Sequence, residues 1–161
     1  TWNDSSLFEI EKEALKKIPE EFFLIVKLHP YLKETHLSDY IKIQSVCERS
    51  EQMVFFDALP PIYPILERCD AYIGDMSSIG YDFLYYNRPM FFFGDEDTKK
   101  PLFTCGHQLK TFNWEEIADH FEQDSQKKMR RELYHYVFDE ISSLKVLKEK
   151  VCNELLTLAL H

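Results

Sequence analysis

Two adjacent serines stand where a short apolar run meets the start of an expected helix. The stretch 74–80 contains Asp75, Ser77 and Ser78. A helix start presents unpaired backbone N–H groups and the positive end of the helix dipole, and both favour an anion. The two hydroxyls could donate to a phosphate, whereas Ser77 could equally be a simple N-cap and Asp75 could hydrogen-bond the turn. The residues alone leave phosphate binding and helix capping open.

A single histidine, His29, follows another apolar run and precedes Pro30. Proline biases the residue before it toward an extended backbone, so we expect His29 to project from the end of a strand. There the imidazole could donate to a phosphate or act as a general acid, although a structural role beside the proline is the alternative. The remaining histidines show no partner spacing and are expected at the surface or in packing: His36, His107, His120, His135 and His161.

The cysteines contain no CxxC pair, so we expect no zinc site and interpret them as free thiols in a reducing compartment. They are Cys47, Cys69, Cys105 and Cys152. Neither GxGxxG nor GxxxxGK[ST] occurs, which excludes the standard dinucleotide and P-loop motifs. The sequence therefore predicts no bound metal and no cofactor.

The composition is that of one globular domain of 161 residues, 45% hydrophobic and 15% aromatic. The formal net charge of -9 disfavours nucleic acid and anionic membranes as partners, because both attract basic surfaces. The longest apolar runs are far too short to cross a bilayer. We therefore expect a cytoplasmic protein with no transmembrane segment and no nucleic-acid partner.

Short apolar runs alternate with helical periodicity along the chain. Strands are expected at 22–28, 53–56, 71–74, 90–93 and, shorter, 108–112. Helices are expected at 7–18, in part of 37–47, at 60–69 with Pro60 and Pro61 in the first turn, and at 78–86, 114–121, 126–138 and 143–160. This alternation is typical of a doubly wound, mostly parallel α/β domain, here 1–161, with 126–161 as C-terminal helices. Ligands bind at the carboxyl ends of such strands, where 29–30, 75–78 and 94–95 should meet.

Several motifs become specific only as an ordered set, which resembles the C-terminal half of the CDP-glycerol glycerophosphotransferase family. That family includes the teichoic-acid glycerol-phosphate primases and polymerases. The resemblance covers roughly 1–121. Its motifs are Lys-Leu-His-Pro at 27–30, Ile-Tyr-Pro-Ile-Leu at 62–66, Cys-Asp-Ala-Tyr-Ile-Gly-Asp-Met-Ser-Ser at 69–78, Tyr-Asp-Phe-Leu at 81–84 and Asn-Arg-Pro-Met-Phe-Phe-Phe at 87–93.

This resemblance implies a GT-B fold of two Rossmann-like domains, in which this chain is the C-terminal domain that holds a CDP-activated donor. An acceptor hydroxyl attacks the β-phosphorus of CDP-glycerol, glycerol phosphate passes to a cell-surface polymer, and CMP leaves. His29 would contact or protonate the donor pyrophosphate, and Ser77 and Ser78 would bind its phosphate oxygens. Asp75 belongs to the same phosphate-binding set and would orient the turn. Supporting roles fall to Lys27 and to Asp82, which lies on the next helix and faces the sheet.

The chain also departs from the family pattern. Met76 stands where the family usually has Tyr, and Gly80-Tyr81 replaces a more apolar pair. The resemblance further implies two partners outside 1–161: an N-terminal acceptor domain and a central strand before Thr1. The strand ending at Leu28 could instead pair directly with the strand ending at Gly74, or a second chain could supply a strand. Peripheral membrane association through the full-length protein is compatible with this assignment.

Two other function classes remain open on the residues alone. One is a non-catalytic α/β binding or interaction module, which the acidic balance and the absent partner domain would fit. The other is a GT-B glycosyltransferase or epimerase-like domain that uses another nucleotide sugar. Binding of CDP-glycerol, CDP or CMP would separate the first from a transferase, and a preference for cytidine over uridine would exclude the second.

Overall fold

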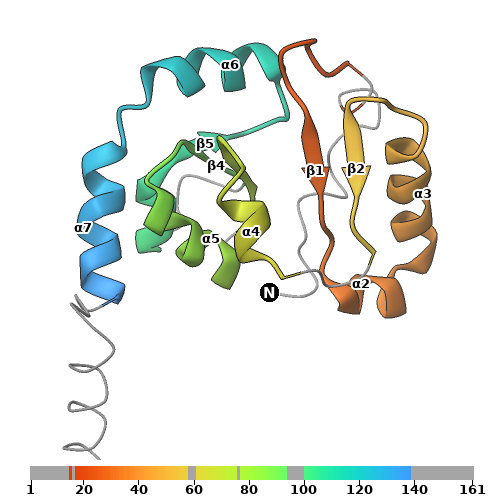
Figure 1. Ribbon diagram of the computed structural model, residues 1–161, viewed down its shortest axis with the longest axis horizontal. Helices are drawn as coiled ribbons and strands as arrows, with labels where there is room; N and C mark the ends of the chain where they lie inside the picture. Colours follow the sequence, from red (N-terminus) through yellow and green to blue (C-terminus); the bar gives the residue numbers. More distant parts are fainter. Residues whose placement is uncertain (1–14, 16, 58–60, 76, 94–99, 139–161) are drawn as a thin grey trace, which may run out of the picture.

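A computed structural model describes residues 15, 17–57, 61–75, 77–93 and 100–138. Parallel strands alternate with helices, which confirms the predicted α/β class (Figure 1). The strands are β1 (Leu24–Val26), β2 (Met53–Phe55), β3 (Tyr72–Gly74), β4 (Met90–Phe93) and β5 (His107–Leu109). The helices are α2 (Pro30–Thr35), α3 (Leu37–Cys47), α4 (Tyr63–Leu66), α5 (Ser78–Phe83), α6 (Trp114–Gln123) and α7 (Lys127–Val137), with 3-10 turns η2 (Leu84–Tyr86) and η3 (Pro101–Cys105).

The strands form two parallel sheets rather than one, β1-β2 and β3-β4-β5. Hydrogen bonds at the starts of β1 and β3 agree with this division. The amide N–H of Leu24 donates to the carbonyl oxygen of Gln52, just before β2 (2.8 Å), and that of Tyr72 donates to the carbonyl oxygen of Pro89, just before β4 (3.0 Å). Within the described residues no ladder joins β1 to β3, so the direct pairing considered above is not found there.

The central strand of the larger sheet, β4, is buried on both faces. Its alternate residues Phe91 and Phe93 belong to one hydrophobic cluster, together with side chains of β1, α3 and α6. Met90 and Phe92 belong to a second cluster, together with side chains of α5, η3 and α7. All four β4 residues are at most 9% exposed. A continuous apolar run is the expected pattern for such a strand, and helices cover both faces of this sheet.

The segment 37–47, predicted to be partly helical, is helical throughout. Tyr40, Ile43 and Cys47 recur at helical spacing and are all buried. The predicted helix at 78–86 is also present, but its last turn tightens into η2 and ends at Asn87, whose φ of 50° is left-handed. Asparagine tolerates this conformation better than most residues, and it ends a helix as glycine often does.

The start predicted for one helix, α4, was wrong. The helix expected to have Pro60 and Pro61 in its first turn begins only at Tyr63, and its first-turn proline is Pro64. Proline suits a first turn because its missing N–H is not needed there, and any of the three prolines satisfies that local rule. The helix α2 was not predicted at all. The expected helices at 7–18 (except Leu15, Lys17 and Ile18) and 143–160 lie outside the described residues.

The helix α7 is attached to the rest of the domain by a buried arginine. Arg130 has no solvent-exposed surface and donates to Asp124 Oδ2 (2.5 Å), Asn87 Oδ1 (3.2 Å) and the carbonyl oxygen of Cys105 (3.2 Å). Its charge is therefore paired and hydrogen-bonded, as a buried charge must be. In the part of the chain that is described, no helix has the length and apolar character needed to cross a membrane.

Candidate functional site

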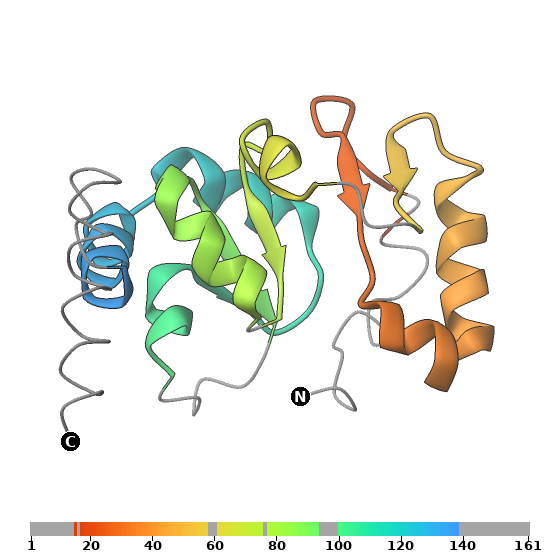
Figure 2. The same cartoon turned by 60° about the horizontal axis from the view of Figure 1, so that its bottom comes forward.

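The carboxyl ends of β1 and β3 lie on the same side of the molecule, and α2 and α5 begin there (Figure 2). His29 is the residue before α2, and Ser77 is the residue before α5. Two of the three segments expected at this edge therefore lie at helix starts on one side of the fold. The third, 94–95, lies outside the described residues.

Ser77 is the N-cap of α5. Its Oγ accepts the backbone N–H of Gly80 (3.3 Å) and lies 3.0 Å from the hydroxyl of Tyr72. The Tyr72 hydroxyl has one proton, which it donates to the carbonyl oxygen of Asp75 (3.1 Å). The Ser77 hydroxyl must then donate its own proton to Tyr72. The capping role left open by the sequence is thus present: the cap uses the Ser77 hydroxyl as an acceptor, and the contact with Tyr72 uses its proton.

Tyr72 is the residue of this turn that the sequence did not single out. Burial raises the pKa of its phenol, which stays protonated and so able to hold the turn. A Cβ at Gly74 would lie 2.8 Å from the Tyr72 hydroxyl. Glycine at 74 therefore makes room for the ring, and the ring in turn fixes the loop between β3 and α5.

Ser78 differs from its neighbour in exposure and in contacts. It is the first residue of α5, its side chain is exposed, and none of the described residues hydrogen-bonds its hydroxyl. Asp82, one helical turn later, lies on the same side of the helix. Asp82 is half-buried, and burial raises the pKa of its carboxyl. Of the two predicted phosphate donors, Ser78 is the one whose proton the turn does not use.

His29 has the extended backbone predicted from Pro30, with φ −65° and ψ 134°. It is exposed, and its Nδ1 accepts the backbone N–H of Tyr31 (3.1 Å), which makes it the N-cap of α2. A neutral imidazole that accepts at Nδ1 carries its proton on Nε2. The fold therefore sets the tautomer in which Nε2 is the donor. Lys27, predicted to support the site, and Asp75, predicted to belong to the phosphate-binding turn, are half-buried at the two strand ends.

A third polar group, missed by the sequence analysis, follows β2. Asp57 accepts from Lys33 Nζ through both carboxylate oxygens (2.8 and 2.9 Å) and from the Tyr40 hydroxyl (2.6 Å). The hydrogen bonds from Lys33 and then Tyr40 hold the pKa of Asp57 below its usual value. Burial, followed by the bond to Asp57, raises the pKa of Tyr40 to about 12. In the sequence, the only signal for Asp57 is an acidic residue after an apolar run. No local pattern indicates that Lys33 and Tyr40 are its hydrogen-bond partners.

These contacts predict an acid-dependent contribution of Asp57 to stability. The folded pKa lies below the unfolded value of 3.8, so the ionised carboxylate stabilises the fold. This contribution is fully present above about pH 4 and is lost as pH falls through the folded pKa. Asp57→Asn should therefore lower the urea midpoint at pH 7, and the difference from the parent should shrink below pH 4. The exposed Asp70→Asn is the control, and an equal loss in that variant would contradict the assignment.

The fold and these strand ends define a parallel α/β protein with polar side chains at the carboxyl edge. A family model described as CDP-Glycerol:Poly(glycerophosphate) glycerophosphotransferase matches residues 3–105. The match covers well over half of the chain, which therefore belongs to this family, and the resemblance drawn from the motifs is confirmed. No curated protein and no solved structure matches the chain.

Proposed function

We propose that this chain is the donor-binding domain of a glycerophosphotransferase that uses CDP-glycerol. The observation that supports this proposal is that the family match contains both polar strand ends, at His29 and at Ser77-Ser78. The two helix starts that follow them lie on one side of the fold (Figure 2). A CDP-activated donor has two linked phosphates, and such an edge could hold them between its donors.

In the proposed reaction the acceptor hydroxyl oxygen attacks the β-phosphorus and the bond to the bridging oxygen breaks. Glycerol phosphate then becomes joined to the acceptor, and CMP leaves with the bonding electron pair. His29 Nε2 donates toward the leaving phosphate, which offsets the negative charge that develops there. The acceptor proton passes to a base outside this chain, in the acceptor domain of the proposed GT-B arrangement.

The donor-side contacts divide between the two serines. Ser78 donates its hydroxyl proton to a phosphate oxygen, because no described residue competes for it. Ser77 caps the helix and positions Ser78, with Tyr72 and Asp75 holding the turn. Lys27 and Asp82 support the site from β1 and α5. A nucleotide donor places the reaction in the cytoplasm, with a polymer acceptor reached at the inner face of the membrane through the full-length protein.

The serine pair offers a matched test. Ser78→Ala should weaken CDP-glycerol binding about 10–150-fold, since a hydrogen bond to a charged group contributes about 1.5–3 kcal/mol. Its melting temperature should stay that of the parent, because alanine suits the first turn of a helix. Ser77→Ala should instead lower the free energy of unfolding by about 0.5–2 kcal/mol through loss of the cap. Titration calorimetry and thermal melting measure both effects.

The outcomes discriminate the role of each serine and the class of protein. Equal affinity of Ser78→Ala and the parent would exclude Ser78 as a phosphate donor. Failure of the parent to bind CDP-glycerol, CDP and CMP would favour a non-catalytic interaction module. Preference for uridine over cytidine nucleotides would favour another nucleotide-sugar enzyme. Release of CMP only when glycerol-phosphate acceptor and acceptor domain are both present would support the full reaction.

A further inference from the structure

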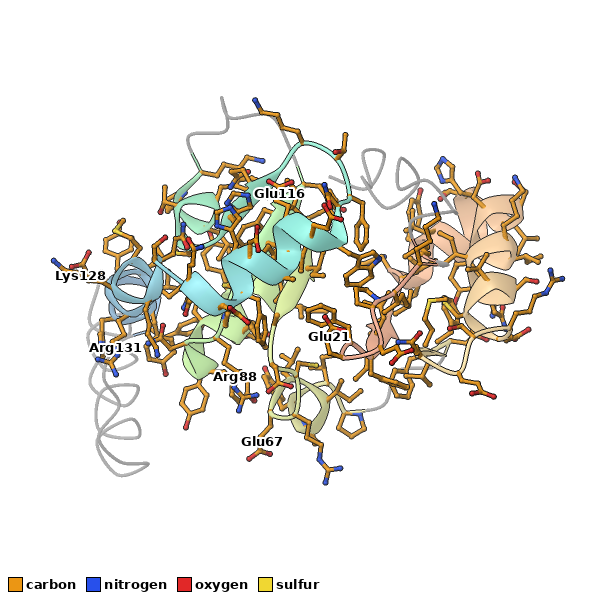
Figure 3. The ribbon with its side chains drawn as sticks, turned by 90° about the horizontal axis from the view of Figure 1, so that it is seen from above. Glu21, Glu67, Arg88, Glu116, Lys128 and Arg131 are labelled. Carbon is orange, nitrogen blue, oxygen red and sulfur yellow. The ribbon has the colours of Figure 1, made fainter. Side chains whose placement is uncertain are left out.

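Two histidines and a glutamate come together between β5 and α6, away from the helix starts described above. His107 Nε2 lies 2.7 Å from Glu116 Oε1. The rings of His107 and His120 are stacked, with centroids 3.5 Å apart and an interplanar angle of 19°. One ligand atom of each residue lies within 4.8 Å of the others. We call these three residues the β5–α6 cluster; Figure 3 labels Glu116 on α6.

The backbone positions this cluster from both sides. A Cβ at Gly106 would lie 2.3 Å from the carbonyl oxygen of Met90, so only glycine allows β5 to start this close to β4, and His107 follows at once. On the other side, Asn113 Oδ1 accepts the N–H groups of Glu115 and Glu116 and so fixes the start of α6. The cluster therefore joins two elements that the fold already holds in place.

The two α6 members project from one side of the helix, since Glu116 and His120 are four residues apart. Trp114 and Ile117 are buried in the hydrophobic core and hold α6 against the sheet. Glu116 occupies the position at which a glutamate often turns back to the N-cap backbone. Here it contacts His107 instead, across to the neighbouring strand. All three cluster side chains are half-buried, and so remain reachable by an ion from solvent.

We propose that the β5–α6 cluster binds a divalent transition-metal ion, with Zn²⁺ as the representative. Two imidazole nitrogens and one carboxylate oxygen are ligands that Zn²⁺ prefers, whereas Mg²⁺ and Ca²⁺ prefer oxygen alone. Zinc–ligand distances near 2.1 Å place ligand atoms about 3.3–3.5 Å apart in a tetrahedral site. The three ligand atoms lie within 4.8 Å of one another, and the metal ion would replace the His107–Glu116 hydrogen bond. Three protein ligands leave a fourth position for water, on the exposed side.

This site is independent of the proposed glycerophosphotransferase chemistry. The family match ends at residue 105, before His107 and the whole of α6. The metal would link β5 to α6 and stabilise the folded state, because the three ligands converge only when that state forms. Neutral imidazoles must supply the lone pairs, so binding also releases any proton that they carry.

The test is titration of the metal-free full chain with Zn²⁺ and with Co²⁺ as a spectroscopic probe. We expect one ion per chain and d–d absorption without the thiolate charge-transfer band that a cysteine ligand would produce. At a Zn²⁺ concentration a hundred times the dissociation constant, the melting temperature should rise by about 5–10 °C. Absence of one-to-one binding, or a thiolate band, would overturn the proposal.

Two ligand variants and two matched controls locate the site. Glu116→Gln and His120→Gln should each weaken Zn²⁺ binding at least 100-fold, about the largest loss seen for residues that only support a ligand. Glu115→Gln removes an exposed acid from the same helix turn, and His135→Gln removes a histidine from α7; both should bind as the parent does. Parent-like affinity in either folded ligand variant would overturn the assignment, and one folded variant suffices to decide it.

Discussion

Arg130→Met should lower the free energy of unfolding by about 3–5 kcal/mol, which is the largest effect on stability that we expect. The substitution leaves the Asp124 carboxylate without its partner, and it removes the donors to Asn87 and Cys105. A buried charge without a partner costs more than the lost packing alone. The melting temperature of a chain this long should fall by roughly 10 °C. Urea unfolding and thermal melting measure the change.

The neighbouring arginine supplies the control for this experiment. Arg131 lies on the same helix but is exposed (Figure 3). Arg131→Met should shift stability by less than about 0.5 kcal/mol, as surface substitutions usually do. Adding Asp124→Leu to Arg130→Met should recover part of the loss, because it removes the unpaired charge. Similar stabilities of the two arginine variants would contradict the role of Arg130.

His29→Asn should reduce glycerophosphate transfer by about 100–10,000-fold, the range that general acids contribute. Asparagine can keep the cap of α2, because its side-chain oxygen accepts a backbone N–H as the Nδ1 of His29 does. The variant removes only the Nε2 donor of an exposed side chain, so the free energy of unfolding should change by less than about 0.5 kcal/mol. The measurement is the rate of CMP release by the enzyme that contains this domain, alongside thermal melting.

His29→Ala distinguishes the two roles of the same ring. It removes both the donor and the cap, so it should lose transfer activity as His29→Asn does and also lose about 0.5–2 kcal/mol of stability. His36→Asn is the matched control, at a half-buried helix boundary outside the proposed site, and it should keep full transfer activity. Full transfer activity in His29→Asn would show that His29 acts only as a cap, and the catalytic proposal would then be wrong.

Local sequence determined much of this protein, because the relevant interactions lie within a few residues. The apolar run at 90–93 predicted a strand, and β4 has those bounds. Pro30 specified the extended backbone of His29. The ordered motifs between Lys27 and Phe93 identified the family, which the match over 3–105 confirms. The sequence also predicted α6 and α7, and part of α3, whereas its prolines did not mark where the short helix α4 begins.

Only the tertiary structure decided which polar side chains are paired with one another. The Ser77 hydroxyl is hydrogen-bonded to Tyr72, whereas none of the described residues hydrogen-bonds that of Ser78. This difference between two adjacent serines depends on the orientation of the Tyr72 side chain, which lies five residues earlier on β3. His107 showed no partner spacing in the sequence, yet the packing of β5 beside α6 sets it against Glu116 and His120. Arg130 reaches Asn87, 43 residues away. Such contacts follow from the packing of whole elements, whereas periodicity and capping record only neighbours along the chain, so no local pattern could specify them.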